Sequence, residues 1–144
     1  MAGLIVLLLS CVACVQAPVL PDETPPARPA ALDSSSDERI DLRIGATATL
    51  PGTATTVTFV RVVSEGRCPK GVQCVWEGDA AVELRVAPAG GDAQTITLHT
   101  NDRFERQAVI GGVTVRLEQL EPYPEADKPI APDSYVVTLR ASAG

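Results

Sequence analysis

The sequence has few of the residues that most metal and enzyme sites require. Its 144 residues include one histidine, His99, and four cysteines. A structural zinc site needs four nitrogen or sulfur ligands, and the chain does not offer four at tight spacing. It also has no Gly-x-Ser-x-Gly elbow, no phosphate-binding glycine loop and no EF-hand spacing. We therefore predict no metal, no cofactor and no enzymatic activity.

An enzyme remains the weaker alternative, because a hydrolytic triad can be assembled from the residues present. Either Ser64 or Ser134 could supply a nucleophile for His99, with Asp79 as the group that orients the imidazole. No placed motif supports this combination. His99 by itself is expected to be a solvated residue on the wet face of a strand.

The sequence also lacks a long apolar run and a basic face. Its longest aliphatic stretch is Leu4–Leu9, whereas a transmembrane helix needs about 20 apolar residues. A signal peptide that is removed on export fits this stretch better. The net charge is -6, and phosphate binding needs a basic face, so we predict no nucleic-acid partner.

The first cysteine follows the apolar stretch directly. The segment Leu8-Leu9-Ser10-Cys11 resembles the lipobox of bacterial lipoproteins, in which the cysteine sulfur receives a diacylglycerol and becomes the new N-terminus. The resemblance implies a signal peptide over residues 1–10 and a lipid on Cys11 that holds the protein at a membrane. Cys14 is the alternative site, because cleavage there would leave no unpaired thiol. Valine after Cys11 resembles the outer-membrane sorting pattern, so we expect a cell-envelope location, facing the periplasm or at the cell surface.

Residues 11–38 are predicted to be a disordered tether between the lipid and a folded domain. From residue 15 onward they hold five prolines and three consecutive serines, with almost no aliphatic pattern. Such a composition buries too little apolar surface to offset the entropy of ordering. One base against five acids gives this stretch a net charge of -4, which favours an extended spacer.

Residues 39–144 form a single predicted β domain. Apolar residues alternate with polar ones in several short runs, which indicates antiparallel strands with one buried and one wet face. We place strands near 40–50, broken at Gly45, and at 55–64, 79–87, 94–99, 105–110, 113–121 and 134–141. About seven short strands favour an antiparallel β-sandwich, with a small β-barrel as the alternative. The four prolines of residues 121–132 predict a long loop that crosses outside the sheets.

The second pair of cysteines is predicted to form a disulfide. Cys68 and Cys74 are separated by five residues that include Pro69 and Gly71, which can turn the chain. A closed loop of this size stabilises a domain by about 2 kcal/mol. A metal site and a redox site are weaker alternatives, because redox motifs usually space the cysteines two residues apart.

Trp76 allows two interpretations. The indole is either buried in the core, packed against the disulfide or the inner sheet, or exposed as an anchor for a protein partner. In the second interpretation Arg67 and Lys70 supply charge beside it. The partner-binding candidates are therefore Arg67, Lys70, Trp76 and, from the proline-rich loop, Tyr123.

Three segments of the chain resemble a group of small bacterial secreted or lipid-anchored proteins of uncharacterised function. They are Arg67–Gly78, with the pattern Arg-Cys-Pro-x-x-Val-x-Cys-x-Trp-x-Gly, and then Leu120–Pro124 and Tyr135–Leu139. The resemblance implies an all-β domain outside the cytoplasm and brings no catalytic residues with it. We expect a binding or accessory module, and alternatively an inhibitor of a periplasmic or extracellular hydrolase.

Overall fold

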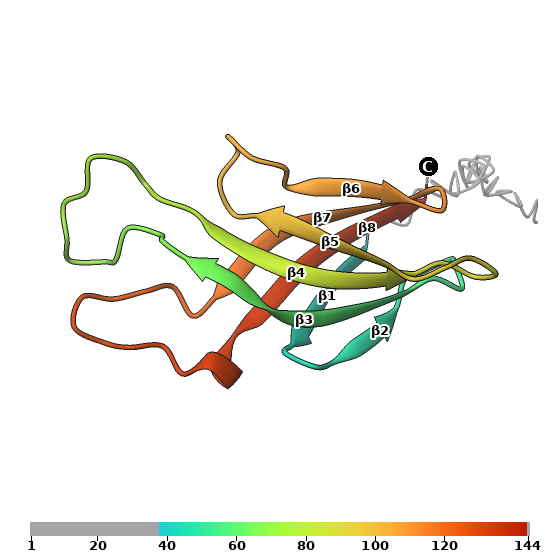
Figure 1. The fold of residues 1–144 in the computed structure, drawn as a ribbon, viewed down its shortest axis with the longest axis horizontal. Coiled ribbons are helices and arrows are strands. Elements are labelled where there is room, and N and C mark those ends of the chain that lie inside the picture. Colours follow the sequence, from blue (N-terminus) through green and yellow to red (C-terminus); the bar gives the residue numbers. More distant parts are fainter. Residues whose placement is uncertain (1–37, 144) are drawn as a thin grey trace, which may run out of the picture. The chain divides into compact units, whose positions relative to one another are not determined.

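The chain folds into two packed antiparallel sheets, and the computed structural model describes residues 38–143. The elements are β1 (Glu38–Arg43), β2 (Thr47–Thr49), β3 (Thr56–Glu65), β4 (Ala80–Ala87), β5 (Gln94–His99), β6 (Gln107–Ile110), β7 (Val113–Glu121), the 3-10 helix η1 (Pro132–Ser134) and β8 (Val136–Ala143). One sheet has the order β1-β8-β7-β6 and the other β2-β3-β4-β5 (Figure 1). The predicted β-sandwich is confirmed, since the strands form two sheets and not one closed sheet.

Gly45 marks the point where the chain changes sheets. The predicted strand over 40–50 is two strands, because β1 pairs with β8 whereas β2 pairs with β3 in the other sheet. Gly45 has a φ of +79°, which an L side chain rarely adopts, and its N–H donates to the carbonyl of Phe59 at 2.7 Å. The expected break at this glycine is therefore the corner between the two layers.

The core lies between the inner faces of the two sheets. Residues two apart in the alternating runs point inward, as predicted, and most are fully buried, which contributes about 1.5–3 kcal/mol for each large aliphatic side chain. The largest of them are Val57, Phe59, Val82, Leu84, Val86, Leu98, Val115, Leu117, Val137 and Leu139. Ile96, from the same predicted pattern, is only partly buried against this core.

The bulge in β7 and the start of β8 were not predicted. A register shift in β7 lies between Leu117 and Gln119, so Leu120 joins Leu117 in the core. The predicted strand 134–141 begins later, since Ser134 closes η1 and Tyr135 precedes β8. Tyr135 is nevertheless buried.

The predicted signal peptide, Cys11, Cys14 and nearly all of the predicted tether lie outside the described residues. Glu38, the last residue assigned to that tether, is the first residue of β1. No helix in residues 38–143 is both long enough and apolar enough to cross a membrane.

The strand register gives the sandwich two distinct ends. Glu38 pairs with Ala141 near the end of β8, whereas Val136, the first residue of β8, pairs with Arg43 and Glu121. The loops that follow β3 and β7 therefore lie at the end remote from Glu38, which we call the loop end. Figure 1 shows both long loops on the left and the start of β1 on the right, near the C-terminus.

Candidate functional site

The loop end is built around the connection between β3 and β4, residues 66–79, which we call the cysteine loop. Its disulfide joins Cys68 and Cys74, with the two sulfurs 2.05 Å apart, as predicted. At the base, the amide of Gly66 donates to the carbonyl of Asp79 at 2.8 Å, and the amide of Cys68 donates to the carbonyl of Glu77 at the same distance. The base of the loop therefore continues the antiparallel pairing of β3 with β4.

Gly78 is required for this closure. Its φ is +78°, and a Cβ atom built on it would lie 2.0 Å from the carbonyl oxygen of Gly66. No side chain fits in that space, so only glycine lets the two arms of the loop approach closely.

Arg67 is a buried cation, which leaves little of its surface for the contact role that was predicted. Only 7% of it is exposed. Its Nε and Nη2 atoms donate to the carboxylate of Glu65 at distances from 2.5 to 3.2 Å. Its Nη1 donates to the carbonyl of Leu120 at 2.6 Å, and Nη2 also donates to that of Pro122 at 3.0 Å. One side chain therefore connects the cysteine loop to the end of β7 in the other sheet.

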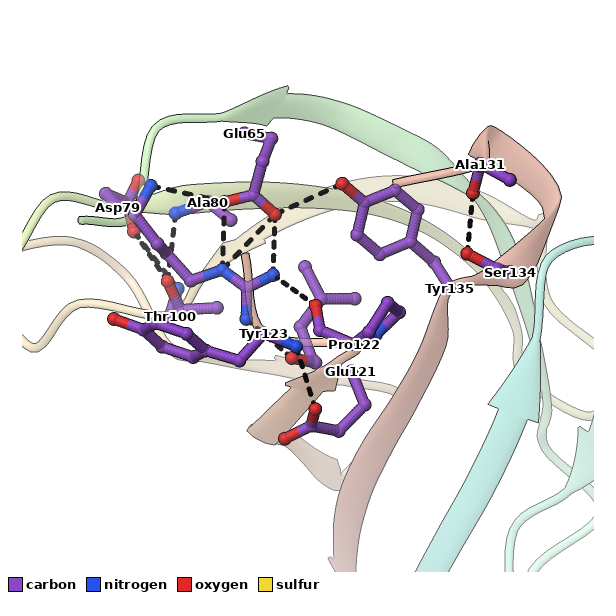
Figure 2. A network of polar contacts seen from close by, with 12 residues as sticks. Glu65, Asp79, Ala80, Thr100, Glu121, Pro122, Tyr123, Ala131, Ser134 and Tyr135 are labelled. Atoms are coloured by element: carbon purple, nitrogen blue, oxygen red, sulfur yellow. Dashed lines mark hydrogen bonds and ion pairs between the residues drawn. The ribbon is translucent and has the colours of Figure 1, made fainter. Parts of the chain in front are cut away.

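Glu65 connects this network to the start of β8. Its carboxylate also accepts a hydrogen bond from the Tyr135 hydroxyl at 3.2 Å (Figure 2). Burial raises the pKa of the Tyr135 phenol above its ordinary value, and the neighbouring charge of Glu65 raises it further. The tyrosine therefore stays protonated, as a donor, over the whole physiological pH range.

The connection between β7 and β8, residues 122–135, packs directly on the cysteine loop, and we call it the proline-rich loop. The amide of Lys70 donates to the carbonyl of Pro124 at 2.9 Å, and the amide of Ala126 donates to the carbonyl of Lys70 at 3.0 Å. The Tyr123 ring lies 4.9 Å from the Arg67 guanidinium carbon and 5.5 Å from Lys70 Nζ. The predicted residues Lys70 and Tyr123 thus lie side by side on one continuous surface.

Three apolar side chains of the cysteine loop are exposed. The exposed fractions are 49% for Val72, 105% for Val75 and 48% for Trp76. The interpretation of Trp76 as a core residue is wrong, and the structure agrees with its alternative placement at the surface. The core consists of aliphatic residues together with Phe59 and Tyr135, and the indole is not part of it.

Asp79 and His99 belong to a hydrogen-bond network at the base of the cysteine loop. Nδ1 of His99 lies 2.6 Å from one Asp79 oxygen, and the other oxygen accepts from the amides of Thr100 and Asn101 at 3.1 and 3.0 Å. The Asn101 side chain then donates to Glu77 Oε1 at 3.0 Å and to the carbonyl of Gly78 at 2.7 Å. His99 is therefore a half-buried member of a hydrogen-bond network, not the solvated residue that the alternation predicted.

The structure brings together two members of the possible triad, Asp79 and His99, without a serine. Ser64 pairs with Ala81, which in turn pairs with His99, so a whole strand separates the serine from the imidazole. Ser134 lies in η1 and donates to the carbonyl of Ala131 at 2.7 Å. Neither serine is within hydrogen-bond distance of His99 in the described residues.

A small cavity of about 200 Å³ opens beside this network, between the cysteine loop and Tyr123. Its acidic lining residues are Glu77, which Asn101 holds, and Asp102, whose pKa is lowered by a hydrogen bond from Arg106. Within residues 38–143, no three His, Cys, Asp or Glu side chains are close enough together to hold a metal ion. Both acids that line the cavity are therefore already paired with other side chains.

No protein-family model, no curated protein and no solved structure was found to match the chain. A proposal about its function therefore depends on the geometry of its own residues.

Proposed function

We propose that the chain is an exported bacterial envelope lipoprotein whose β-sandwich is a protein-binding module, with the cysteine loop as its contact surface. The observation that carries the proposal is the exposure of Val72, Val75 and Trp76 on a loop that is fixed at its base. Contiguous exposed apolar patches mark interaction surfaces, and these three residues lie within five positions of one loop. Tryptophan is also enriched among residues that dominate binding energy.

The rigidity of the loop supports the same function. The disulfide, the Arg67 guanidinium and the two backbone hydrogen bonds to the proline-rich loop hold the base before any partner arrives. A preorganised loop loses less conformational entropy on binding, so more of the contact energy remains as affinity. We therefore assign Arg67 a positioning role and keep Lys70, Trp76 and Tyr123, together with Val72 and Val75, as the contact residues.

The orientation of the domain fits an N-terminal anchor. Glu38 enters the sandwich at the end remote from the cysteine loop. A tether that joins the domain there leaves the contact surface facing away from the attachment point, where a partner can reach it.

A photo-crosslinking residue at position 76 tests the binding function in cells of the native host. We expect one protein adduct from position 76 that disappears when Val75 is replaced by serine. Val109 is the matched control, because its side chain is 68% exposed but lies on β6, near the opposite end. Equal adducts from positions 76 and 109, or none from either, would contradict the assignment.

Intact mass tests the lipid anchor. The mature protein should carry a diacylglycerol and begin at Cys11, and a Cys11→Ser variant should lose the lipid. If the Cys11→Ser variant still carries the lipid, the site of lipidation is Cys14. A mature chain without lipid would refute the lipid anchor but would not bear on the protein-binding function.

A further inference from the structure

The binding proposal can be extended to the class of partner. Taking that proposal as its basis, we propose that the cysteine loop is a substrate-like inhibitor of an extracytoplasmic serine protease. Val75 is the side chain that enters the primary specificity pocket, and the Val75–Trp76 peptide bond is the one presented to the catalytic serine.

Val75 has the exposure that such a role requires. It is 105% exposed, so its side chain is open to an approaching cleft. Its neighbours along the loop are less exposed, since Val72 and Trp76 are each about half covered. Valine is small and β-branched, and therefore fills a small apolar pocket of the elastase kind and not a deep aromatic or an acidic one.

Cys68 fixes the chain on both sides of the Val75–Trp76 peptide bond, an arrangement that we call the clamp. The Cys68 sulfur is bonded to Cys74, immediately before Val75, and the Cys68 amide donates to the carbonyl of Glu77, immediately after Trp76, at 2.8 Å. Only Val75 and Trp76 lie between the two fixed points. The Asn101 side chain adds hydrogen bonds to the Glu77 side chain and the Gly78 carbonyl on the far side.

This clamp turns a substrate into an inhibitor by keeping the leaving group in place. When the serine oxygen attacks the Val75 carbonyl carbon, the C–N bond to Trp76 breaks, and the protease histidine passes the serine proton to the Trp76 amine. The amine then stays beside the acyl-enzyme because Glu77 and Gly78 are held. Groups held this well can react with effective molarities of about 10⁵ M or more, so the amine reforms the peptide bond faster than water attacks.

The sandwich itself would also survive a completed cleavage. Addition of one water gives a Val75 carboxylate and a Trp76 amine, and both cysteines stay on the N-terminal piece. The two pieces remain associated because β3 and β4, which lie on either side of the cut, are paired along their lengths. The cleaved chain therefore keeps the shape that blocks the cleft.

The charge of the loop favours a protein cleft over a membrane surface as the occupant. Between Cys68 and Trp76 the loop carries one base, Lys70, and no acid. One positive charge and three apolar side chains supply little attraction to a lipid surface.

The test uses the purified full-length chain with its disulfide intact, against serine proteases with small apolar, deep aromatic and acidic primary pockets. We expect tight inhibition of the small-pocket enzymes. A Val75→Lys variant should weaken that inhibition by about 100-fold and gain inhibition of the enzyme with the acidic pocket. The matched control is Val109→Lys, which places the same charge on an exposed residue of β6. It should change the inhibition of neither the small-pocket enzymes nor the enzyme with the acidic pocket.

A second arm tests the clamp. A Cys68→Ser, Cys74→Ser double variant should become an ordinary substrate that is cut between Val75 and Trp76, whereas the oxidised chain is cut slowly or not at all. Far-ultraviolet circular dichroism confirms that the variant keeps its sheets. If the variant unfolds, Asn101→Ala, which releases one side of the clamp only, should show faster cleavage at the same bond.

Three results would overturn the inhibitor proposal. They are the absence of inhibition across the panel, an unchanged specificity in Val75→Lys, and binding to phospholipid vesicles that depends on Val75 and Trp76. None of these results refutes the proposed protein-binding function, which the crosslink from position 76 tests separately. A crosslink to a protein that is not a protease would support the binding function and contradict the inhibitor proposal.

Discussion

Replacing Arg67 with methionine tests how the loop end is held together. Methionine keeps the apolar stem but removes every donor, so Glu65 loses its buried counter-charge and the carbonyls of Leu120 and Pro122 lose their partner. Removing one partner of a buried ion pair costs about 3–5 kcal/mol. Because 22% of the Glu65 side chain is exposed, water can solvate part of its carboxylate. We therefore expect a loss of about 3 kcal/mol in the free energy of unfolding, at the low end of that range.

Urea unfolding followed by circular dichroism measures this loss, and Arg61→Met is the matched control. Arg61 makes the same two-pronged contact with Glu83, at 3.2 and 3.0 Å, but its side chain is 59% exposed. Water and salt screen such a pair, so its removal should change stability far less than removal of Arg67. Hydrogen exchange should also show faster exchange at the Lys70 and Ala126 amides in Arg67→Met, with the central strands unaffected.

The decisive result is the difference between the two variants. If Arg67→Met is no more destabilising than Arg61→Met, the guanidinium does not connect the two loops in the way we describe. The companion substitution Glu65→Gln gives a second check. Added to Arg67→Met, it removes the orphaned charge and should recover part of the lost stability.

Three further outcomes are expected. Replacing Cys68 and Cys74 with serine should lower the free energy of unfolding by about 2 kcal/mol, read from thermal melts beside the reduced wild type. Gly78→Ala should destabilise the domain by more than about 1 kcal/mol in urea, since its φ is positive and its Cβ has no room. The raised pKa of Tyr135 predicts that stability is full below the ordinary tyrosine pKa and falls as the pH rises through the folded value; Tyr135→Phe should abolish that fall in a pH titration of stability.

The architecture was predictable because its signals are local. Alternation of apolar residues gives strand positions and their inward faces, and Gly45 indicates where a strand must break. The disulfide also followed from spacing and turn residues. The bulge after Leu117 was not predictable, because a register shift is decided by pairing with β8 and not by β7 itself.

The site was harder to predict because its contacts join distant segments. Arg67 reads in the sequence as an exposed charge beside a loop, yet its partners at residues 120 and 122 lie more than 50 positions away. Trp76 reads as a core aromatic because tryptophan is usually well buried. Only the structure shows that the core is built from other residues and that Trp76 lies half exposed outside it. No motif in the sequence indicated that Asn101 would bind the cysteine loop. The one available signal was its position just beyond the end of a predicted strand.

The pairing of Glu38 with Ala141 has a consequence for how the domain can be combined with other proteins. The two strand ends are neighbours in an antiparallel ladder, so the chain leaves the sandwich close to where it enters. A segment with adjacent ends can be inserted into a surface turn of a host protein, or rejoined as a circular permutant, without pulling its sheets apart. Because those ends lie opposite the cysteine loop, such a chimera would display the loop at the end remote from the host protein. The loop sequence could then be exchanged while the sheets stay unchanged.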